Sequence, residues 1–517
     1  LSLILIVTLF ILITYLSLIG IKTDRFNKQI IDEIKNVDQN LDIDLKQVQL
    51  ILDPFSFLIN AKTLGPNFRY KNKIIEIENI RTQLTIKSLI NDNFLLKNLY
   101  ISTKSLKVQN LISFIRSVNR SKELLILENF VKKGYLIADI KIDFDENGKI
   151  KDNYEIRGFL KDGKIDVFKK YKLDNINFIF EIQKNASKFQ EINFNYENLN
   201  LLFEEINLKN ENGISFVKGK IINKNFTISE KIIKKFFNKP LFKVSNINLD
   251  SDSVFSFEID KKYKINNFKI KSRLKINNAI LNNELELINF FPKIKKKINL
   301  SDHNLKFEYA DQNFLIEGSG KIFIQENFDK IDYSITKKDK RINFKSSLEI
   351  KNNNFNINFL NYDKNEDSNL VLFFDGVKEI KNKISMNLIS LKEKNSEIKI
   401  KNVNFDENLR IVNFQNAEFK YLDTEDIKNE FKIFSKDKEY ILEGKSFNAN
   451  NLIEKLLNSE DKSKFNIFKN VFYLNIKIKK VYLDRDNDIK NLNGFLIFQN
   501  EQISEANLSS KFSVNER

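Results

Sequence analysis

Few residues in this chain could carry out catalysis. Cysteine is absent and histidine occurs once, at His303, within the turn-like run of residues 301–304. A chain without cysteine has no disulfide, no thiol nucleophile and no Cys/His zinc site. A lone histidine in a predicted turn is typical of a solvated side chain rather than of a general base. The carboxylates would allow a two-carboxylate hydrolase, but no glycine-rich phosphate loop, G-x-S-x-G or H-E-x-x-H motif accompanies them. We therefore expect no enzymatic activity, no metal and no cofactor.

The chain is strongly basic, with 85 Lys and Arg against 69 Asp and Glu and a net charge of +16. Such a charge would suit nucleic acid or anionic lipid as a partner. However, the chain is saturated with Lys, Asn, Ile and Phe, the residues of AT-rich codons, and its basic residues are scattered along predicted strands. We expect genome composition, and not nucleic-acid binding, to explain most of the lysine excess.

Residues 1–21 form an apolar stretch without a charged side chain. As a helix it would be about 31 Å long, close to the hydrocarbon thickness of a bilayer, and its hydroxyls could bond to helix carbonyls. A cleaved signal usually has a shorter core and a small-residue cleavage site, and a buried helix more often shows a polar stripe. The sequence thus predicts a transmembrane anchor, with those two interpretations as alternatives. The basic residues that follow do not set the orientation of this helix, because the positive-inside rule compares the charges on both sides of a membrane helix.

After the anchor the periodicity changes twice. Residues 22–44 have apolar residues at three- and four-residue spacing, which predicts a short amphipathic helix. Alternation typical of strands begins at Val48. The pair Asp53-Pro54 predicts a turn, and Phe55, Phe57 and Ile59 then alternate as a strand.

From Glu123 onward the sequence predicts strand after strand. Apolar and polar residues alternate, which is typical of antiparallel strands with one apolar and one wet face. At about 12 to 16 residues per strand and turn, the chain would hold roughly 30 to 40 strands. Hairpin turns are predicted at four dipeptides, Asn147-Gly148, Asp162-Gly163, Asn212-Gly213 and Asn282-Asn283.

Three stretches break the alternation. Thr227 and Glu230 have capping-box spacing before a short basic amphipathic helix, which we expect to pack over a sheet end rather than to bind anionic lipid. The run Phe290-Phe291-Pro292, followed by lysines, predicts a charged loop. A further short helix is predicted at residues 450–457.

This order of elements resembles the AsmA-like family of periplasmic β-groove proteins, of the TamB and YhdP type. The resemblance rests on the anchor, on residues 48–68, on the runs at residues 75–80, 84–90 and 94–101, and on residues 440–449 near the other end. It implies an anchor at residues 1–21, an AsmA-like N-terminal region at 22–122, a repetitive β-groove body at 123–439 and the start of a C-terminal region at 440–517. The chain starts without methionine and stops within this pattern, so we expect a fragment of a longer protein.

The predicted fold is mainly β, with the N-terminal transmembrane helix followed by a long, curved antiparallel β-sheet and a few short helices. An unbroken apolar face could hold acyl chains away from water, where each exposed CH₂ costs about 0.8 kcal/mol. Ordinary sandwich cores are the alternative. The candidate residues lining this face are Phe178, Phe180, Ile192, Phe194, Tyr196, Phe255, Phe257, Phe268, Ile270, Phe355, Ile357 and Phe359.

The resemblance implies a single-pass protein of the bacterial inner membrane, with most of the chain in the periplasm. Its expected role is phospholipid transport between the inner and outer membranes, without catalysis. The expected partners are phospholipid, the inner membrane and outer-membrane or envelope proteins. Two alternatives remain: an assembly factor for outer-membrane proteins that binds polypeptide on the same fold, and an anchored carbohydrate-active enzyme, which the absence of Trp disfavours.

Overall fold

The fold is mainly β and divides into two compact units. In the computed structural model, unit 1 comprises Leu1–Asn223 and Val254–Phe268, and unit 2 comprises Lys224–Ser253 and Lys269–Arg517. The predicted boundaries at 122/123 and 439/440 lie inside unit 1 and unit 2, respectively. The structure describes the chain except residues 1, 26, 38, 86–95, 119–120, 146–148, 150, 168–170, 237–243, 284–286, 380–382, 407–409, 438, 451–452, 454–470, 500–501 and 513–517.

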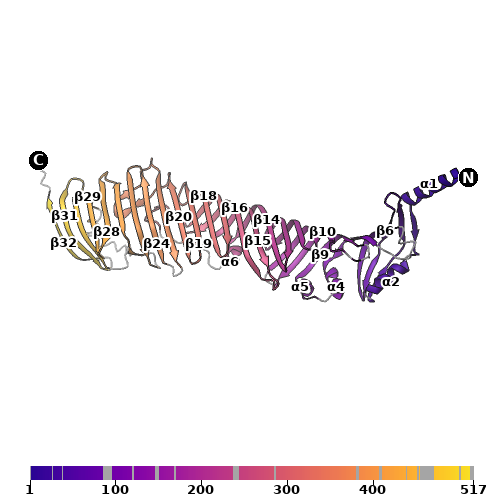
Figure 1. Ribbon diagram of the computed structural model, residues 1–517. Coiled ribbons are helices and arrows are strands. Elements are labelled where there is room, and N and C mark those ends of the chain that lie inside the picture. The colour runs from indigo at the N-terminus through magenta and orange to yellow at the C-terminus, as the bar shows by residue number, and fades with distance from the viewer. Residues whose placement is uncertain are drawn as a thin grey trace. The chain divides into compact units, whose positions relative to one another are not determined.

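Unit 1 begins with a helix and a group of antiparallel strands (Figure 1). Strands β1, β3, β4, β6 and β7 pair in that order, and β2 and β5 extend β6 on a second branch. Helix α2 packs Ile30 against the buried Val48, Ala61 and Leu84, so the predicted amphipathic helix is confirmed. The bounds are α1 (Ser2–Leu18), β1 (Ile21–Thr23), α2 (Asn27–Val37), β2 (Leu41–Asp44), β3 (Val48–Asp53), β4 (Leu58–Leu64), β5 (Asn67–Tyr70), β6 (Lys73–Thr85) and β7 (Leu96–Thr103).

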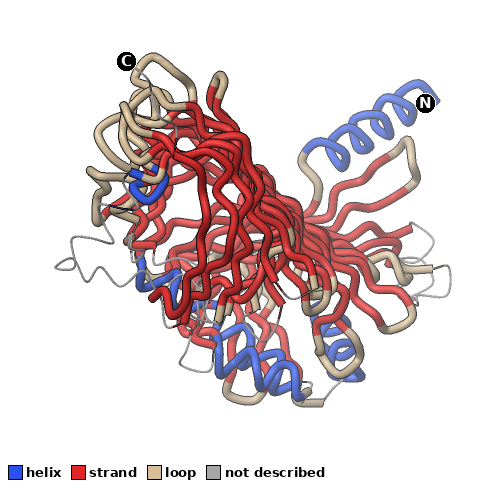
Figure 2. Tube along the Cα trace, turned by 90° about the vertical axis from the view of Figure 1, so that its left-hand side faces the viewer, coloured by secondary structure: helices blue, strands red, loops and turns tan. Residues whose placement is uncertain are grey.

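The N-terminal helix α1 is shorter than the predicted anchor, with 17 residues. Among the described residues, no helix has both the length and the apolar character needed to cross a membrane. The Thr8 and Thr14 hydroxyls donate to the carbonyls of Ile4 and Phe10 at 2.8 and 2.7 Å, as expected for hydroxyls in an apolar helix. In Figure 2, α1, marked by the N-terminus, projects from the strands that follow it.

Two helices that the sequence analysis did not predict interrupt the strands of unit 1. Helix α4 (Val108–Val118) and helix α5 (Lys122–Phe130) lie against β9 (Figure 1). Strand β8 (Leu106–Lys107) ends directly before α4, and Val108 and Ile112 pack on Val131 as one helical face. The Ser121 hydroxyl caps α5 by accepting from the Leu124 amide at 3.2 Å. The expected unbroken run of strands from Glu123 is therefore wrong at its start.

The rest of unit 1 is an antiparallel meander in which each strand pairs with the next from β9 to β14. The Asn212-Gly213 hairpin between β13 and β14 is confirmed, with positive φ at both residues. Asn147-Gly148 lies outside the described residues. The bounds are β9 (Val131–Asp143), β10 (Glu155–Val167), β11 (Tyr171–Gln183), β12 (Ala186–Tyr196), β13 (Leu199–Glu211), β14 (Ile214–Ser229), β15 (Val244–Ile259) and β16 (Ile265–Asn282).

β-Bulges within these strands switch the alternation of apolar and polar residues. Asp162 in β10, Asn175 in β11 and Glu191 in β12 have φ of 53°, 52° and 52°, and the pairing registers of β10 with β11 and of β11 with β12 shift beside them. Each extra residue reverses which positions face the apolar side. The hairpin predicted at Asp162-Gly163 is therefore wrong, because this pair is a bulge in the middle of β10.

Unit 2 is a second meander, from β17 to β32. Neighbouring strands are antiparallel, except that β29 and β30 are parallel. The helix predicted at residues 450–457 falls in the connection between those two strands, and most of its residues lie outside the described part of the chain. The bounds are β17 (Lys297–Ala310), β18 (Asn313–Phe323), β19 (Phe328–Lys338), β20 (Arg341–Ile350), β21 (Asn356–Ile357), η1 (Asn358–Leu360), β22 (Tyr362–Asp363), β23 (Leu370–Glu379), β24 (Ile384–Glu393), β25 (Ser396–Phe405), β26 (Ile411–Asn413), β27 (Asn416–Leu422), β28 (Lys428–Lys436), β29 (Glu439–Asn448), β30 (Phe472–Tyr482), β31 (Asp488–Gln499) and β32 (Gln502–Phe512).

The basic helix of unit 2 starts later in the sequence than the predicted N-cap, Thr227, implies. Helix α6 (Glu230–Phe236) begins at Glu230, whereas Thr227 still belongs to β14, so the capping box at Thr227 is wrong. Ile232 and Ile233 are buried, and Lys234 pairs with Glu230 at 2.6 Å on the other side. This agrees with the expectation that the helix packs against the protein.

Two loops pack side chains into a large core in unit 2. Phe291, from the loop after β16, and Phe355 and Tyr362, from the segment between β20 and β23, join the same cluster as the fully buried Ile350 and Leu370. The loop predicted at Phe290-Phe291-Pro292 is confirmed. Asn282-Asn283 opens this long loop and is not a tight hairpin.

Buried polar side chains fix both loops to the sheet. Gln325 accepts from the Lys293 amide at 2.9 Å and donates to the Asn354 carbonyl at 2.7 Å. Glu393, which is 5% exposed, accepts from the Tyr362 hydroxyl at 2.5 Å. Because these groups are buried and partnered, removing one would leave its partners unsatisfied.

Candidate functional site

The predicted lining residues fall into two different environments. Those on β11, β12, β15 and the first part of β16 all belong to unit 1, from Phe178 to Phe268. Ile270 is half-buried on β16 and belongs to unit 2, as do Phe355, Ile357 and Phe359. Eight of the twelve predicted residues thus belong to unit 1 and four to unit 2.

Aromatic side chains in unit 1 form a row across its sheet. Neighbouring ring centroids are 5.6 Å apart for Phe178 and Phe189, 5.5 Å for Phe194 and Phe203, and 6.0 Å for Phe203 and Phe255. These separations are typical of aromatic contacts. The rings form two contacting groups, one of Phe178, Phe180 and Phe189 and one of Phe194, Phe203, Phe255, Phe257 and Phe268. The two groups together are called the aromatic row below.

Two members of the row, Phe189 and Phe203, were not among the predicted lining residues. Phe189 lies directly opposite Phe180 in the β11–β12 pairing. Phe189 does not fit the period-two alternation that contains Ile192, because the bulge at Glu191 lies between the two residues. Two consecutive polar residues, Gln190 and Glu191, between apolar ones are the sequence signal that could have located this bulge.

Glycines let the rings lie close to the backbone of the sheet. A Cβ at Gly219 in β14 would come within 2.3 Å of the Phe255 ring, and one at Gly158 in β10 within 2.8 Å of the Phe180 ring. Phe255 therefore reaches over β14 to touch Phe203 on β13. The absence of a side chain at Gly219 makes the row continuous across that strand.

Most of the row is only partly shielded from solvent. Phe180 is 5% exposed, and Ile192 and Tyr196 beside it are buried. Phe178, Phe189, Phe194, Phe203, Phe255 and Phe257 are half-buried, and Phe268 is 39% exposed. Helices α4 and α5 pack on β9 and on the edge of β10, whereas the partners described for β11 to β13 are neighbouring strands. The row is therefore an apolar surface that solvent partly reaches.

The opposite face of the same strands is charged. Lys188 on β12 pairs with Glu205 on β13 at 3.5 Å, and Lys164 on β10 pairs with Asp174 on β11 at 2.9 Å. These pairs are exposed and contribute little stability. They mark the solvent-facing side of the sheet, so the aromatic row lies on its apolar side.

The last three predicted lining residues do not form a strand. Phe355, Ile357 and Phe359 alternate in sequence, but β21 is only Asn356–Ile357 and the chain turns into the 3₁₀ helix η1 at Asn358. Phe355 packs on Phe291 with ring centroids 5.3 Å apart, inside the core of unit 2, while Phe359 is 45% exposed. Phe355 and Ile357 are therefore core residues of unit 2, and Phe359 lies at its surface.

The single histidine is buried, contrary to the expected solvated loop residue. His303 lies in β17, beside Asp302 with φ of 52°, and is 0% exposed. Its Nε2 is 2.9 Å from the Lys321 carbonyl oxygen, and its ring lies over Gly320. Burial lowers the pKa of His303 below its usual value, so the ring is neutral at pH 7. We see a packed core residue and not a catalytic one.

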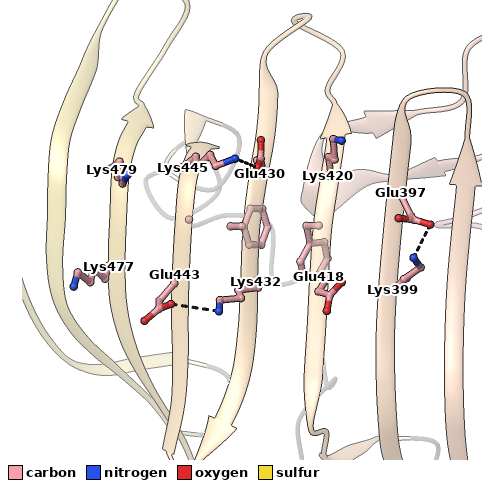
Figure 3. Close-up of a pocket in the computed structure, with 13 residues that line it drawn as sticks. Glu397, Lys399, Glu418, Lys420, Glu430, Lys432, Glu443, Lys445, Lys477 and Lys479 are labelled. Atoms are coloured by element: carbon pink, nitrogen blue, oxygen red, sulfur yellow. Dashed lines mark hydrogen bonds and ion pairs between the residues drawn. The ribbon is translucent and has the colours of Figure 1, made fainter.

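A second candidate is a hollow of 510 Å³ on the charged face of unit 2 (Figure 3). Its walls are alternating lysines and glutamates from β25, β27, β28, β29 and β30. Lys432 pairs with Glu443 at 3.5 Å, and Lys445 pairs with Glu430. The Lys445 ammonium, followed by that of Lys428, holds the pKa of Glu430 below its usual value. Cross-strand ion pairs of this kind are a solvated sheet surface, and they leave no unpaired carboxylate dyad for hydrolysis.

Within the described ranges, no group of three or more His, Asp or Glu side chains could hold a metal ion. No family model matches the chain, and no curated protein or solved structure is similar enough to it to count as a match. The AsmA-like resemblance therefore stays a prediction, and the aromatic row is the feature from which a function is argued.

Proposed function

We propose that this protein is a membrane-attached carrier that holds phospholipid acyl chains along the aromatic row of unit 1, without catalysis. The observation that carries the proposal is a row of mostly half-buried rings on strands β11 to β13 and β15, where the main contacts of β11 to β13 are with neighbouring strands. Each CH₂ that such a surface takes from water is stabilised by about 0.8 kcal/mol.

The length of the row suits an acyl chain. From β11 to β16 there are five strand spacings, which is roughly 24 Å across the sheet. Within the group from Phe194 to Phe268 each ring contacts the next, which would give an acyl chain a continuous apolar path. A chain could therefore slide along the row in small steps, with few CH₂ groups exposed at any time.

The proposal places the protein at the bacterial inner membrane, with unit 1 and unit 2 in the periplasm and phospholipid passing towards the outer membrane. Helix α1 supports membrane attachment, because its apolar side chains are exposed along its length. Leu3, Phe10 and Leu18 are 76%, 70% and 77% exposed, and a charge-free helix in this state is stabilised by burial in lipid.

Site-specific photo-crosslinking tests the carrier. A photoreactive amino acid is placed at Phe194 or Phe257 in the row and, as a matched control, at Phe355 in the core of unit 2. The full chain is incubated with phospholipid vesicles, irradiated and analysed by mass spectrometry. We expect phospholipid adducts at both row positions and none at Phe355.

The same experiment separates the alternatives. Peptide adducts at Phe194 and Phe257, without lipid adducts, would contradict the lipid carrier and support an assembly factor for outer-membrane proteins. Unmodified protein at both positions would mean that the row is a closed core and would overturn the proposal.

A further inference from the structure

The β3–β4 hairpin ends in two aromatic side chains that face solvent. Phe55 is 95% exposed and Phe57 is 72% exposed, although both were expected in a strand. Strand β4 begins only at Leu58, and Phe57 has φ of 53°, a left-handed conformation that aromatic residues rarely adopt. The term aromatic tip is used below for residues 53–57.

Asp53 holds the aromatic tip in one conformation. Its Oδ1 accepts from the Phe55 and Ser56 amides at 3.1 and 3.3 Å, and its Oδ2 accepts from the Ser56 hydroxyl. Such an Asx-type turn orders the loop without burying any of its side chains. The two rings are thus presented to solvent by a structured turn.

The aromatic tip lies at the end of the sheet where α1 joins it. In the β1–β3 pairing, Ile21 is opposite Leu50 and Thr23 opposite Val48, so the chain preceding Ile21 comes from the side of the tip. The Gln49 side chain donates to the Ile19 carbonyl at 3.1 Å, which fixes the end of α1 to β3. The exposed apolar helix and the exposed rings therefore leave unit 1 at the same end.

A row of basic residues crosses the sheet behind the aromatic tip. Lys22 is opposite Gln49, Gln49 opposite Lys62, and Lys62 opposite Arg81, so these side chains share one face. Lys22 and Arg81 are exposed and Lys62 is half-buried. The row lies four residues from Asp53 along β3, which is about 13 Å.

We propose that the aromatic tip inserts into the same anionic bilayer surface that receives α1, with Lys22, Lys62 and Arg81 at the level of the lipid phosphates. Aromatic side chains favour the membrane interface, and interfacial elements enter it by about 5 to 10 Å. At 13 Å behind the tip, the basic row then meets the headgroups, where each cation is attracted to anionic lipid. This inference rests on the membrane attachment in the proposed function, and it adds the residues and the lipid charge that fix unit 1 against the membrane.

Tryptophan fluorescence tests the insertion directly, because the chain has no Trp of its own. The full-length variants Phe55→Trp, Leu12→Trp in α1 and Phe328→Trp in unit 2 each carry a single reporter; Phe328 is 52% exposed and serves as the matched control. Each is mixed with phosphatidylglycerol–phosphatidylcholine vesicles containing brominated acyl chains. We expect a blue shift and quenching for Phe55→Trp and Leu12→Trp, and neither for Phe328→Trp.

Vesicle sedimentation measures what each group contributes. The double variant Phe55→Ser/Phe57→Asn, in which Asn tolerates the left-handed backbone, should lower the affinity about tenfold. Lys62→Gln/Arg81→Gln should lower it by about thirtyfold on anionic vesicles and leave binding to pure phosphatidylcholine unchanged. The matched charge variant Lys338→Gln/Lys340→Gln in unit 2 should bind as the wild type does.

The outcomes separate this inference from the proposals on which it rests. A shift for Leu12→Trp without one for Phe55→Trp would overturn insertion of the tip and leave attachment through α1 intact. No shift for either would overturn both. The carrier function is measured independently by crosslinking at Phe194 and Phe257, so its failure would not affect the fluorescence result.

Discussion

The two units use the same strand pattern and differ in what lies against the apolar face. In unit 1 the aromatic row is half-buried and the partners described for β11 to β13 are strands. In unit 2 two loops deliver Phe291, Phe355 and Tyr362 into a core whose centre, at Ile350 and Leu370, is fully buried. Alternation creates an apolar face in both units. Helices α2 and α4 cover part of it in unit 1, whereas side chains from two loops fill it in unit 2.

Buried charge follows the same division. Among the described residues, the buried His, Asp and Glu side chains, which are His303, Asp329, Glu393 and Asp423, all belong to unit 2. Each is tied to a backbone or side-chain partner, as a buried polar group requires. The aromatic row has no such groups, so we expect the stability of unit 2 to depend on pH more strongly than that of unit 1.

The largest expected effect comes from removing the same side chain in the two units. Phe355→Ala empties a closed core and should lower the free energy of unfolding by about 3 to 5 kcal/mol, whereas Phe194→Ala removes a half-buried ring and should cost about 1 to 2 kcal/mol. Urea titration of both variants measures the difference. Equal losses would mean that the row is packed as tightly as the core, and the contrast between the units would fail.

The second prediction concerns the fixing of the loop in unit 2. Glu393→Leu leaves the Tyr362 hydroxyl and the Asn365 amide without their buried acceptor and should cost about 2 to 3 kcal/mol. Hydrogen exchange of the amides in residues 360–370 should accelerate. Glu397→Leu, which removes an exposed ion pair with Lys399, is the control and should cost less than about 1 kcal/mol. Unchanged exchange in the first variant would show that the loop is held by its apolar contacts alone.

His303 gives unit 2 a dependence on acid. Burial lowers the pKa of His303 in the folded state, so the unfolded state binds the proton first as the pH falls below about 6.5. The free energy of unfolding is thus highest above this pH and falls as the pH is lowered to the folded-state pKa. The total loss is about 1.4 kcal/mol for each pH unit between the unfolded-state and folded-state pKa values. His303→Gln should flatten this part of the curve of unfolding free energy against pH. A curve identical to that of the wild type would contradict a buried, neutral imidazole.

The smallest effect is expected at Asp329 and has the opposite sign. Burial raises the pKa of Asp329, although the Asn353 amide donates to its carboxylate at 2.7 Å. The folded state therefore holds this proton to higher pH than the unfolded state, and this contribution to stability is lost as the pH rises through the folded-state pKa. Asp329→Asn should remove that decline. Urea titration at a series of pH values, from the ordinary pKa of Asp up to neutral pH, measures it. A steeper decline in the variant would contradict the assignment.

Much of the fold could be predicted from period-two alternation, because residues on one face of a strand share one environment. The strands carrying Phe178, Phe194 and Phe257 were predicted in this way. The positions of bulges could not be, since an extra residue such as Glu191 looks like any other polar residue. Helix α4 was missed for a related reason: Val108 and Ile112 fit a helical face as well as the end of a strand.

The candidate site was harder to predict than the strands, because alternation does not tell what covers a face. Phe355 and Phe194 both have asparagine neighbours and an apolar residue two positions later, yet Phe355 is buried in a core and Phe194 is half-buried in the aromatic row. His303 was misplaced because its polar neighbours indicated a turn, whereas the bulge at Asp302 directs its ring inward. Exposure of Phe55 and Phe57 depends on a turn that Asp53 stabilises through its own hydrogen bonds.

The paired bulges give this sheet an unusual tolerance of changes in length. The extra residue at Asp162 in β10 is matched by one at Asn175 in β11 and by one at Glu191 in β12, so the register recovers on either side. A strand of this kind can gain or lose a residue without turning its apolar side chains outward, provided its neighbour changes too. During evolution, strand lengths in unit 1 could thus drift in adjacent pairs while the order of the rings in the aromatic row is preserved.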